Sequence, residues 1–329
     1  MHDNRTAQRH HRGNLPLGNS NKTGPAALSV TIVICNHNRP LLLKRCLQAV
    51  QQIDYPDFSV VVVDSAPISS EAKILAAHHN VRYEISQVRG LSRARNVGTQ
   101  AASSAIVAYL DEDMVPHAGW LRSLVNEFTD EKVMVVTGPV LPLELSSSSE
   151  DELRRMLETS PWGPQRFRID RFCQHWFERA NFGGLGDGNF ALRRNVVDQF
   201  PGFDERLGRG AAICSSEEHY AFFTLLKMGF VIAYAPAAIV FHPSPTITDK
   251  YRRQRIAEAI SYGAFLAWLH PSYSWRIGKY FAGGLFGRRR SWRHWSGQRA
   301  VSPFFYETAS GILCGLSDFL RFLIGIRRS

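Results

Sequence analysis

A short apolar segment that ends in three consecutive acidic residues constrains the fold of this 329-residue chain more than any other feature. Residues 106–110 form an unbroken apolar run, which is typical of a strand covered on both faces. The run ends at Asp111, Glu112 and Asp113, and Pro116 prevents easy continuation of the strand. Adjacent carboxylates repel one another unless a cation or a donor-rich ligand lies beside them. Ligands of open α/β sheets bind beyond the carboxyl ends of strands, so the triplet marks either a ligand site or, alternatively, a solvated acidic turn.

Strand and helix patterns alternate around this segment. Residues 30–35 and 58–63 are apolar runs, each followed by a helical pattern that begins near Pro40 or Ser70. Ser92 is expected to cap the helix that precedes the acidic strand. The other predicted strands are 81–85, 133–137, 190–193, 230–234 and 238–241, and the other predicted helices are 120–128, 195–200 and 217–228. This alternation predicts an α/β fold with a mostly parallel sheet and helices on both faces.

Two regions break the alternation. Residues 145–184 contain four consecutive serines and then several aromatic residues, so we expect irregular structure there. The aromatic side chains either form a lid or wall over a ligand site or belong to the local core. Residues 183–189 are dense in glycine but lack the lysine and hydroxyl pair of a phosphate-binding P-loop. They indicate only that the backbone approaches a ligand closely.

The composition is that of an ordinary globular protein, with 44% hydrophobic and 21% charged residues, and the length allows one large α/β domain with an appendage. The five cysteines are odd in number and include no Cys-x-x-Cys pair, so they predict neither a disulfide framework nor a zinc site, and they fit a reducing compartment. Residues 1–28 are polar and lack the apolar region of a secretory signal. We expect a disordered tail there.

The positive charge is concentrated in residues 249–329, which contain 14 Lys or Arg and 4 Asp or Glu, a difference that equals the +10 of the whole chain. A basic segment on a neutral body points to an anionic surface, either a membrane or a nucleic acid. No recognised nucleic-acid-binding module appears in the sequence. We therefore expect a membrane surface as the partner and no nucleic acid.

Within this segment, helical spacing predicts a helix over 251–269, and a cluster of arginine and tryptophan follows at 288–295. Residues 303–326 are apolar but are interrupted by three charged side chains, so we do not expect a membrane-spanning helix. A helix that lies in the plane of the lipid headgroups fits this pattern better. The alternative is a helical subdomain packed on the main body.

Two further features have both a structural and a chemical interpretation. Glu217 and Glu218 begin a predicted helix, where the helix dipole alone favours carboxylates. His242 ends an apolar strand, so it is either a buried side chain with satisfied hydrogen bonds or a metal ligand that meets the acidic triplet.

The order of these motifs resembles that of the family 2 glycosyltransferases, which have the GT-A fold. The resemblance covers about residues 29–242 and rests on VTIVICNHNRP, VVVVDS, GLSRARNVG, the DED triplet, GDGNFALRR, GFDERLGRG, SSEEHY and VFHP. It implies a Rossmann-like sheet and transfer of a sugar from a nucleotide-diphosphate-sugar to an acceptor hydroxyl with inversion. We therefore expect three parts: a tail at 1–28, a GT-A domain at 29–248 and a basic helical segment at 249–329.

The resemblance also implies roles for individual residues. The donor nucleotide would be bound by His37, Asp64, Arg93, Arg95 and Asp111, the metal by Asp113 and His242, and the acceptor side would include Gly188 and Asn189. Carboxylate oxygens suit Mg²⁺ or Mn²⁺, either of which neutralises a diphosphate leaving group. The catalytic base would be Glu218, with Glu217 as its neighbour, although the family usually has Asp at the second position.

These expectations together describe a metal-dependent glycosyltransferase associated peripherally with the cytoplasmic face of the membrane. Its partners would be a nucleotide-sugar donor and a glycan or lipid-linked acceptor, in the synthesis of a surface polysaccharide or glycolipid. The alternatives are a catalytically inactive homologue that acts as a binding or scaffold subunit, which the Glu-for-Asp change makes conceivable, and a nucleotidyltransferase.

Overall fold

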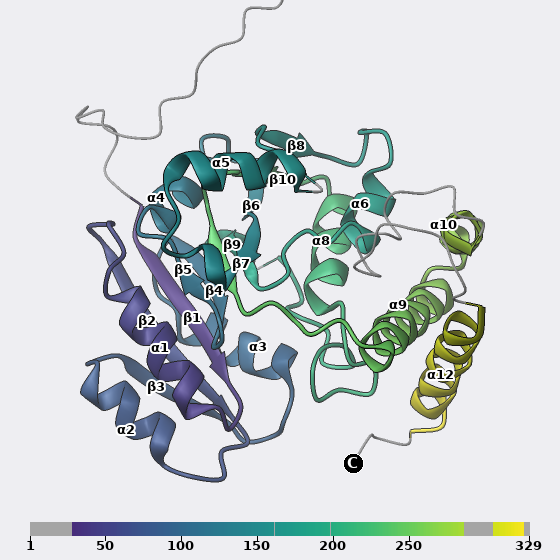
Figure 1. The fold of residues 1–329 in the computed structure, drawn as a ribbon, viewed down its shortest axis with the longest axis horizontal. Helices are drawn as coiled ribbons and strands as arrows, with labels where there is room; N and C mark the ends of the chain where they lie inside the picture. The colour runs from purple at the N-terminus through teal and green to yellow at the C-terminus, as the bar shows by residue number, and fades with distance from the viewer. Residues whose placement is uncertain (1–27, 161, 198, 286–304, 326–329) are drawn as a thin grey trace, which may run out of the picture.

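A computed structural model describes residues 28–160, 162–197, 199–285 and 305–325 (Figure 1). The tail predicted at 1–28 therefore lies outside the described residues except for Leu28, and so does the arginine and tryptophan cluster at 288–295.

The centre of the molecule is one eight-stranded sheet (Figure 1). Its strands, in spatial order, are β3 (Arg82–Ser86), β2 (Phe58–Ser65), β1 (Val30–Asn36), β4 (Ile106–Asp111), β9 (Asn189–Arg193), β6 (Val133–Thr137), β10 (Val231–Tyr234) and β8 (Phe167–Ile169). The pairs β3–β2, β2–β1, β1–β4 and β6–β10 are parallel, whereas β9 and β8 run antiparallel to their neighbours. The predicted mostly parallel sheet is confirmed.

Helices cover both faces of this sheet because each strand sends alternate apolar side chains to each side. One core joins Ile32 and Val62 to α1 (Pro40–Val50), α2 (Glu71–His78) and α4 (Trp120–Val125). The other core joins Val33 and Val63 to helices on the opposite face. Those helices are α3 (Leu91–Ala101), α6 (Trp176–Phe182) and α8 (Glu217–Lys227), while α7 (Arg194–Val197) is a single turn after β9.

A second, three-stranded sheet was not predicted from the sequence. It consists of β5 (Val115–Pro116), β11 (Val240–His242) and β7 (Val140–Pro142), in that order. Val115 is opposite Phe241 in the antiparallel β5–β11 pair. Because β5 starts two residues after the acidic triplet and β11 ends in His242, this pairing brings the histidine beside the triplet.

Two local predictions were wrong. Ser92 does not cap α3: the N-cap is Gly90, and the Ser92 hydroxyl inside the helix donates to the Leu207 carbonyl at 2.7 Å. The region 145–184 is not irregular throughout, since it contains α5 (Glu150–Thr159), β8 and α6, after a 3₁₀ turn at Leu143–Leu145. A Ser-x-x-Glu capping box starts α5, with Ser149 accepting from the Glu152 backbone N–H, and this signal was present in the sequence.

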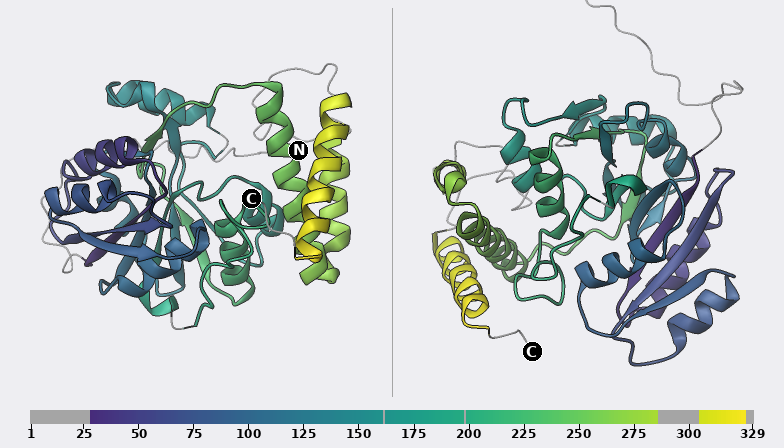
Figure 2. Two further views of the ribbon diagram at one scale, coloured as in Figure 1. Left: turned by 90° about the horizontal axis from the view of Figure 1, so that it is seen from below. Right: turned by 180° about the vertical axis from the view of Figure 1, so that it is seen from behind.

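The C-terminal helices share a core with the sheet. Helix α9 (Asp249–Leu269) begins at the N-cap Thr248 and is followed by a 3₁₀ turn (Pro271–Tyr273), α10 (Ser274–Leu285) and α12 (Phe305–Leu323). Phe265 of α9 and Tyr280 of α10 lie in the core that also contains α6 and α8, and α12 packs along α9 (Figure 2). The boundary predicted after residue 248 thus stays a prediction, and side chains from both sides of it form one core. No helix in the described parts of the chain has the length and apolarity needed to cross a bilayer.

Candidate active site

A cavity of about 640 Å³ lies at the carboxyl ends of the central parallel strands. Its walls combine the ends of β1, β2 and β4 with residues from more distant parts of the chain. From these strand ends come Asn36, His37, Ser65, Asp111, Glu112 and Asp113; from elsewhere come Arg39, Arg89, Arg209, His242 and Gln254. Carboxylates and guanidinium groups therefore face the same space, as a ligand that carries both a cation and anionic groups requires.

Asp113 and His242 come together as the sequence suggested. The His242 Nε2 atom lies 3.5 Å from Asp113 Oδ1, and Arg39 Nη1 lies 3.2 Å from the other carboxylate oxygen. Burial raises the pKa of Asp113, but the hydrogen bond and charge of His242 outweigh it and hold that pKa below its usual value. Asp113 raises the pKa of His242 in turn. One carboxylate and one imidazole that converge on a cavity fit a divalent cation. Such a cation would replace Arg39, and the proton shared between His242 and Asp113, as the partners of Asp113.

The predicted nucleotide-binding residues at the ends of β1 and β2 have different surroundings. His37 lines the cavity, and its Nδ1 atom lies 2.6 Å from the Ser65 carbonyl oxygen. Asp64 is only 2% exposed, and its two carboxylate oxygens accept hydrogen bonds from Asn36 (2.8 Å) and Tyr83 (3.0 Å). Its side chain therefore holds β1, β2 and β3 together at the edge of the cavity. Direct contact between Asp64 and the base of a nucleotide would require the hydrogen bonds from Asn36 and Tyr83 to be replaced.

Arg93 and Arg95 also differ, although both lie on α3. Arg93 forms an ion pair with Glu205 at 3.1 Å, and both side chains are partly exposed. Arg95 is 2% exposed and lies over the Phe190 ring, with its guanidinium carbon 5.3 Å from the ring centroid. The cavity wall contains neither residue. The structure thus assigns Arg95 to the interior of the site and Arg93 to its periphery.

Arg95 connects the acidic triplet to the acidic pair of α8. One nitrogen, Nη2, lies 3.1 Å from Asp111 Oδ1, and the other, Nη1, lies 2.6 Å from Glu217 Oε1 and 3.7 Å from Glu218 Oε2. Burial raises the pKa of Glu217 to about 7, with a further increase from the Glu218 charge, although Arg95 opposes both. Burial also raises the pKa of Glu218 against the effect of Arg95. One cation among the two buried carboxylates of α8 and the partly exposed Asp111 favours retention of a proton within the α8 pair.

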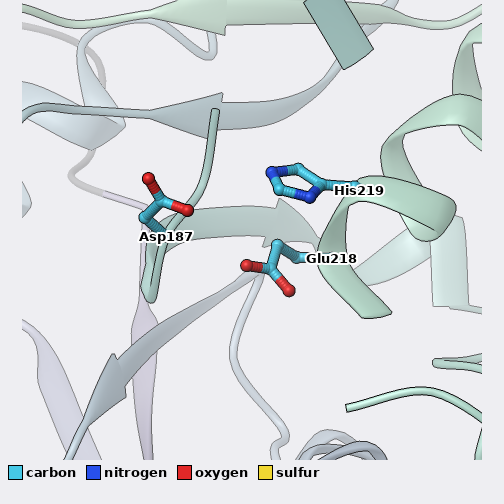
Figure 3. Close-up of side chains that lie close together, drawn as sticks. All are labelled: Asp187, Glu218 and His219. Atoms are coloured by element: carbon cyan, nitrogen blue, oxygen red, sulfur yellow. The ribbon is translucent and has the colours of Figure 1, made fainter. Parts of the chain in front are cut away.

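Glu218 belongs to a second polar cluster on the other side of the Arg95 pairs. One ligand-type atom from each of Asp187, Glu218 and His219 lies within 4.8 Å of the others (Figure 3). Asp187 has a φ of 30°, a conformation that is uncommon for residues other than glycine and that clusters at functional sites. Burial lowers the pKa of His219, which favours the neutral imidazole. Glu218 and His219 lie in the first turn of α8, where the positive end of the helix dipole opposes a bound cation.

The glycines that flank Asp187 allow its loop to pack closely against Glu218 and Asp111. Gly186 (φ 100°) packs on Glu218, where an added Cβ would lie 3.1 Å from Cγ, and Gly188 (φ 79°) packs on Asp111, where it would lie 2.5 Å from Oδ2. A side chain at Gly188 would clash with Asp111, and one at Gly186 would crowd Phe222 and Glu218. Gly188 thus acts through its lack of a side chain.

Asn189, predicted on the acceptor side, is fully buried and has internal partners. Its Oδ1 accepts from the Trp120 indole at 2.8 Å, and its Nδ2 donates to the carbonyls of Pro139 (3.0 Å) and Ala238 (2.8 Å). The side chain therefore connects the main sheet to β7 and β11. Its contribution to the site is to support the strand that carries His242.

Sequence reasoning missed several cavity residues. Arg39 lies in the same motif as His37, so the motif itself was a signal for it. Arg89 and Arg209 come from loops, and Gln254 comes from α9, a helix assigned to another part of the chain. No spacing rule relates these positions to the acidic triplet, because tertiary packing alone brings them together.

Comparison with known proteins identifies the family. The family model described as Glycosyl transferase family 2 matches residues 31–199. The chain belongs to this family. The match includes β1, the acidic triplet and the glycine loop, whereas the α8 pair and His242 lie beyond it.

Two curated relatives illustrate the similarity. A pre-mycofactocin glycosyltransferase of Mycobacterium tuberculosis is 25% identical over 256 residues, which is 76% of this chain and 50% of that protein. An N-acetylglucosaminyltransferase of Bradyrhizobium diazoefficiens is 25% identical over 255 residues, or 72% of this chain and 50% of the relative. The chain thus spans about half the length of these relatives.

Among solved structures, a mannosyltransferase from Pyrobaculum calidifontis, determined in complex with GDP-mannose and Mn²⁺, has a TM-score of 0.57. It covers 89% of this chain and 87% of its own, at 16% identity. At that identity the likeness shows the fold alone, and it confirms the predicted GT-A architecture.

Removal of the Arg95 charge should destabilise the protein strongly. We expect Arg95→Met to lower the free energy of unfolding by about 3–5 kcal/mol, because it leaves buried carboxylates without their cation. Arg93→Met is the matched control, since it removes an exposed ion pair of the same helix and should cost less than about 1 kcal/mol. Urea unfolding of both variants measures the difference, and equal losses would contradict this role for Arg95.

Proposed function

We propose that this protein is a metal-dependent, inverting glycosyltransferase. It transfers a sugar from a nucleotide-diphosphate-sugar to an acceptor hydroxyl. The observation that carries this proposal is the composition of the cavity, in which Asp113 and His242 can hold a cation and Arg89 and Arg209 line the same space. Membership of family 2 supports the same reaction class.

The donor would lie with its nucleotide toward His37 and its diphosphate between the acidic triplet and the arginines. A divalent cation bound by Asp113 and His242 would neutralise charge on the leaving nucleoside diphosphate, and Mg²⁺ or Mn²⁺ suits these ligands. The guanidinium groups of Arg89 and Arg209 would donate hydrogen bonds to the phosphate oxygens. Charge that develops on the diphosphate is thus stabilised by groups already in place.

Glu218 is the proposed catalytic base. Its carboxylate would accept the proton of the acceptor hydroxyl while that oxygen forms a bond to the anomeric carbon and the bond to the diphosphate breaks. Glu218 is 8% exposed and borders the Asp187 cluster rather than the cavity described above, so the acceptor would approach from the α8 side. Arg95 keeps Glu217 and Glu218 in place relative to Asp111.

A panel of nucleotide sugars tests the reaction class. With Mn²⁺ or Mg²⁺, we expect the purified chain to release the nucleoside diphosphate from one donor, and Asp113→Ala to abolish that release because the cation loses its carboxylate. Release of pyrophosphate would instead indicate a nucleotidyltransferase. Metal-dependent nucleotide binding without release from any donor, in the presence of glycan and lipid-linked acceptors, would indicate an inactive homologue that acts as a binding subunit.

Glu218→Gln should abolish transfer but leave nucleotide affinity unchanged, because an amide cannot accept the proton. Since the pKa of Glu218 is raised above the ordinary 4.5, the rate of the unaltered enzyme should fall with decreasing pH at a midpoint above that value. A pH series of initial rates measures this, with isothermal titration for binding. A near-normal rate in Glu218→Gln would show that another group is the base.

The C-terminal helices support a second part of the proposal, peripheral association with the cytoplasmic face of a membrane. On α12, apolar side chains at helical spacing are exposed: Leu313 (68%), Leu316 (43%), Leu320 (58%) and Leu323 (45%). The segment that contains them also holds the net positive charge of the chain, which attracts anionic headgroups. A surface polysaccharide or glycolipid precursor would supply the acceptor there.

Vesicle binding tests this association. We expect the chain to sediment with vesicles that contain phosphatidylglycerol, and the double variant Leu313→Glu, Leu320→Glu to remain in solution because the apolar face is lost. Ile74→Glu, at a position on α2 that is 62% exposed, is the matched control and should sediment normally. Sedimentation that is unchanged in the double variant would exclude α12 as the membrane contact.

A further inference from the structure

A buried carboxylate on α9 lies directly behind the candidate donor cavity. Glu258 is 4% exposed, and within the described residues its carboxylate accepts hydrogen bonds from Arg209 Nη1 at 2.5 Å, Gln254 Nε2 at 2.9 Å and Arg255 Nη1 at 2.9 Å. A carboxylate with this burial requires such partners, since an unpaired buried charge is strongly unfavourable. Glu258 therefore fixes the positions of all three donors.

Two of these three donors line the cavity. Arg209 and Gln254 contribute to its wall, whereas Arg255 does not. Within the described parts of the chain, both hydrogen bonds of Arg209 leave from Nη1, to Glu258 and to the Cys214 sulfur, so Nε and Nη2 have no acceptor there. The Arg209 side chain is 53% exposed, and a ligand can reach it.

The charges favour an anion at this wall. Glu258 is paired with Arg209 and Arg255, so its negative charge is compensated. Arg209 and the acidic triplet border the same cavity, and no ion pair joins them in the described residues. A guanidinium fork whose orientation is already fixed matches phosphate oxygens and loses little entropy when it binds them. An ammonium group or a neutral ligand has no negative charge that could pair with Arg209.

We propose that Arg209 and Gln254 bind the diphosphate of the donor, and that Glu258 is the residue that positions both. This inference rests on the proposed function and assigns the diphosphate site to side chains outside the segment that matches the family model. It also explains why α9 shares a core with the catalytic body: the helix supplies one wall of the donor site. The remaining N–H of the Gln254 amide and the Nε and Nη2 groups of Arg209 are the donors that would contact phosphate oxygens.

The backbone around Arg209 supports a fixed rather than a free arginine. Its carbonyl accepts a hydrogen bond from the Leu91 N–H at 2.9 Å, which ties the loop to the first residue of α3. Gly210 packs against Arg89, where an added Cβ would lie 3.0 Å from Cγ, and Arg89 is a second cavity arginine. The loop thus holds two guanidinium groups on the same wall.

Titration calorimetry on the full chain with Mn²⁺ tests the proposal, using UDP and GDP as probes and uridine and guanosine as the matched nucleosides. We expect Arg209→Met to weaken binding of the preferred diphosphate by about tenfold or more, as the loss of a charge-assisted hydrogen bond predicts, and to leave nucleoside affinity unchanged. Arg206→Met is the control, since it removes an arginine of the same loop that pairs with Asp204 and lies outside the cavity wall. Its diphosphate affinity should stay within about twofold of the unaltered chain.

Glu258→Gln tests whether Glu258 positions Arg209 and Gln254 or only stabilises the folded protein. We expect it to weaken diphosphate binding while nucleoside binding persists, a difference that a merely structural loss would not produce. If Arg209→Met fails to fold, Gln254→Leu provides the same comparison. Diphosphate affinity unchanged in Arg209→Met or Gln254→Leu would overturn this inference alone. No binding of UDP or GDP by the unaltered chain would overturn it together with the proposed function.

Discussion

The charge on Arg95 is the interaction on which the rest of the site depends. A buried guanidinium persists only with anionic partners, and here it has Asp111 on one side and Glu217 and Glu218 on the other. These carboxylates come from β4 and α8, which are far apart in the sequence. The guanidinium therefore fixes the separation between the donor side and the proposed base. Substitutions that change this separation should affect both halves of the reaction.

Two features of the backbone place further charged groups beside those that pair with Arg95. The three-stranded sheet brings His242 to Asp113, because the β5–β11 pairing aligns the end of one strand with the start of the other. The loop of Gly186 and Gly188 lets Asp187 lie between Asp111 and Glu218 without a side-chain clash. Both features bring charged groups close to one another through main-chain geometry and small residues. Repulsion between those groups is what a bound cation and a diphosphate would relieve.

The C-terminal helices share a core with the sheet and also carry the proposed contact with a membrane surface. Glu258 of α9 reaches the cavity through Arg209 and Gln254, while Phe265 on the same helix lies in the sheet core. The exposed leucines of α12, which packs along α9, point away from this core. A partner that binds α12 would thus contact a helix pair whose inner member supports the donor site.

The sequence by itself determined most elements of the main sheet and the chemical groups at its edge. Apolar runs such as 106–110, proline at the start of α1 and the acidic triplet specify strands, helices and the sheet edge, because these depend on local periodicity and backbone restrictions. Only the tertiary structure decided three features: the β5–β11 pairing, the burial of Arg95 and the position of Gln254 in the cavity wall. They join segments whose separation along the chain carries no periodic signal, and their stability arises from burial and charge pairing that exist only after folding.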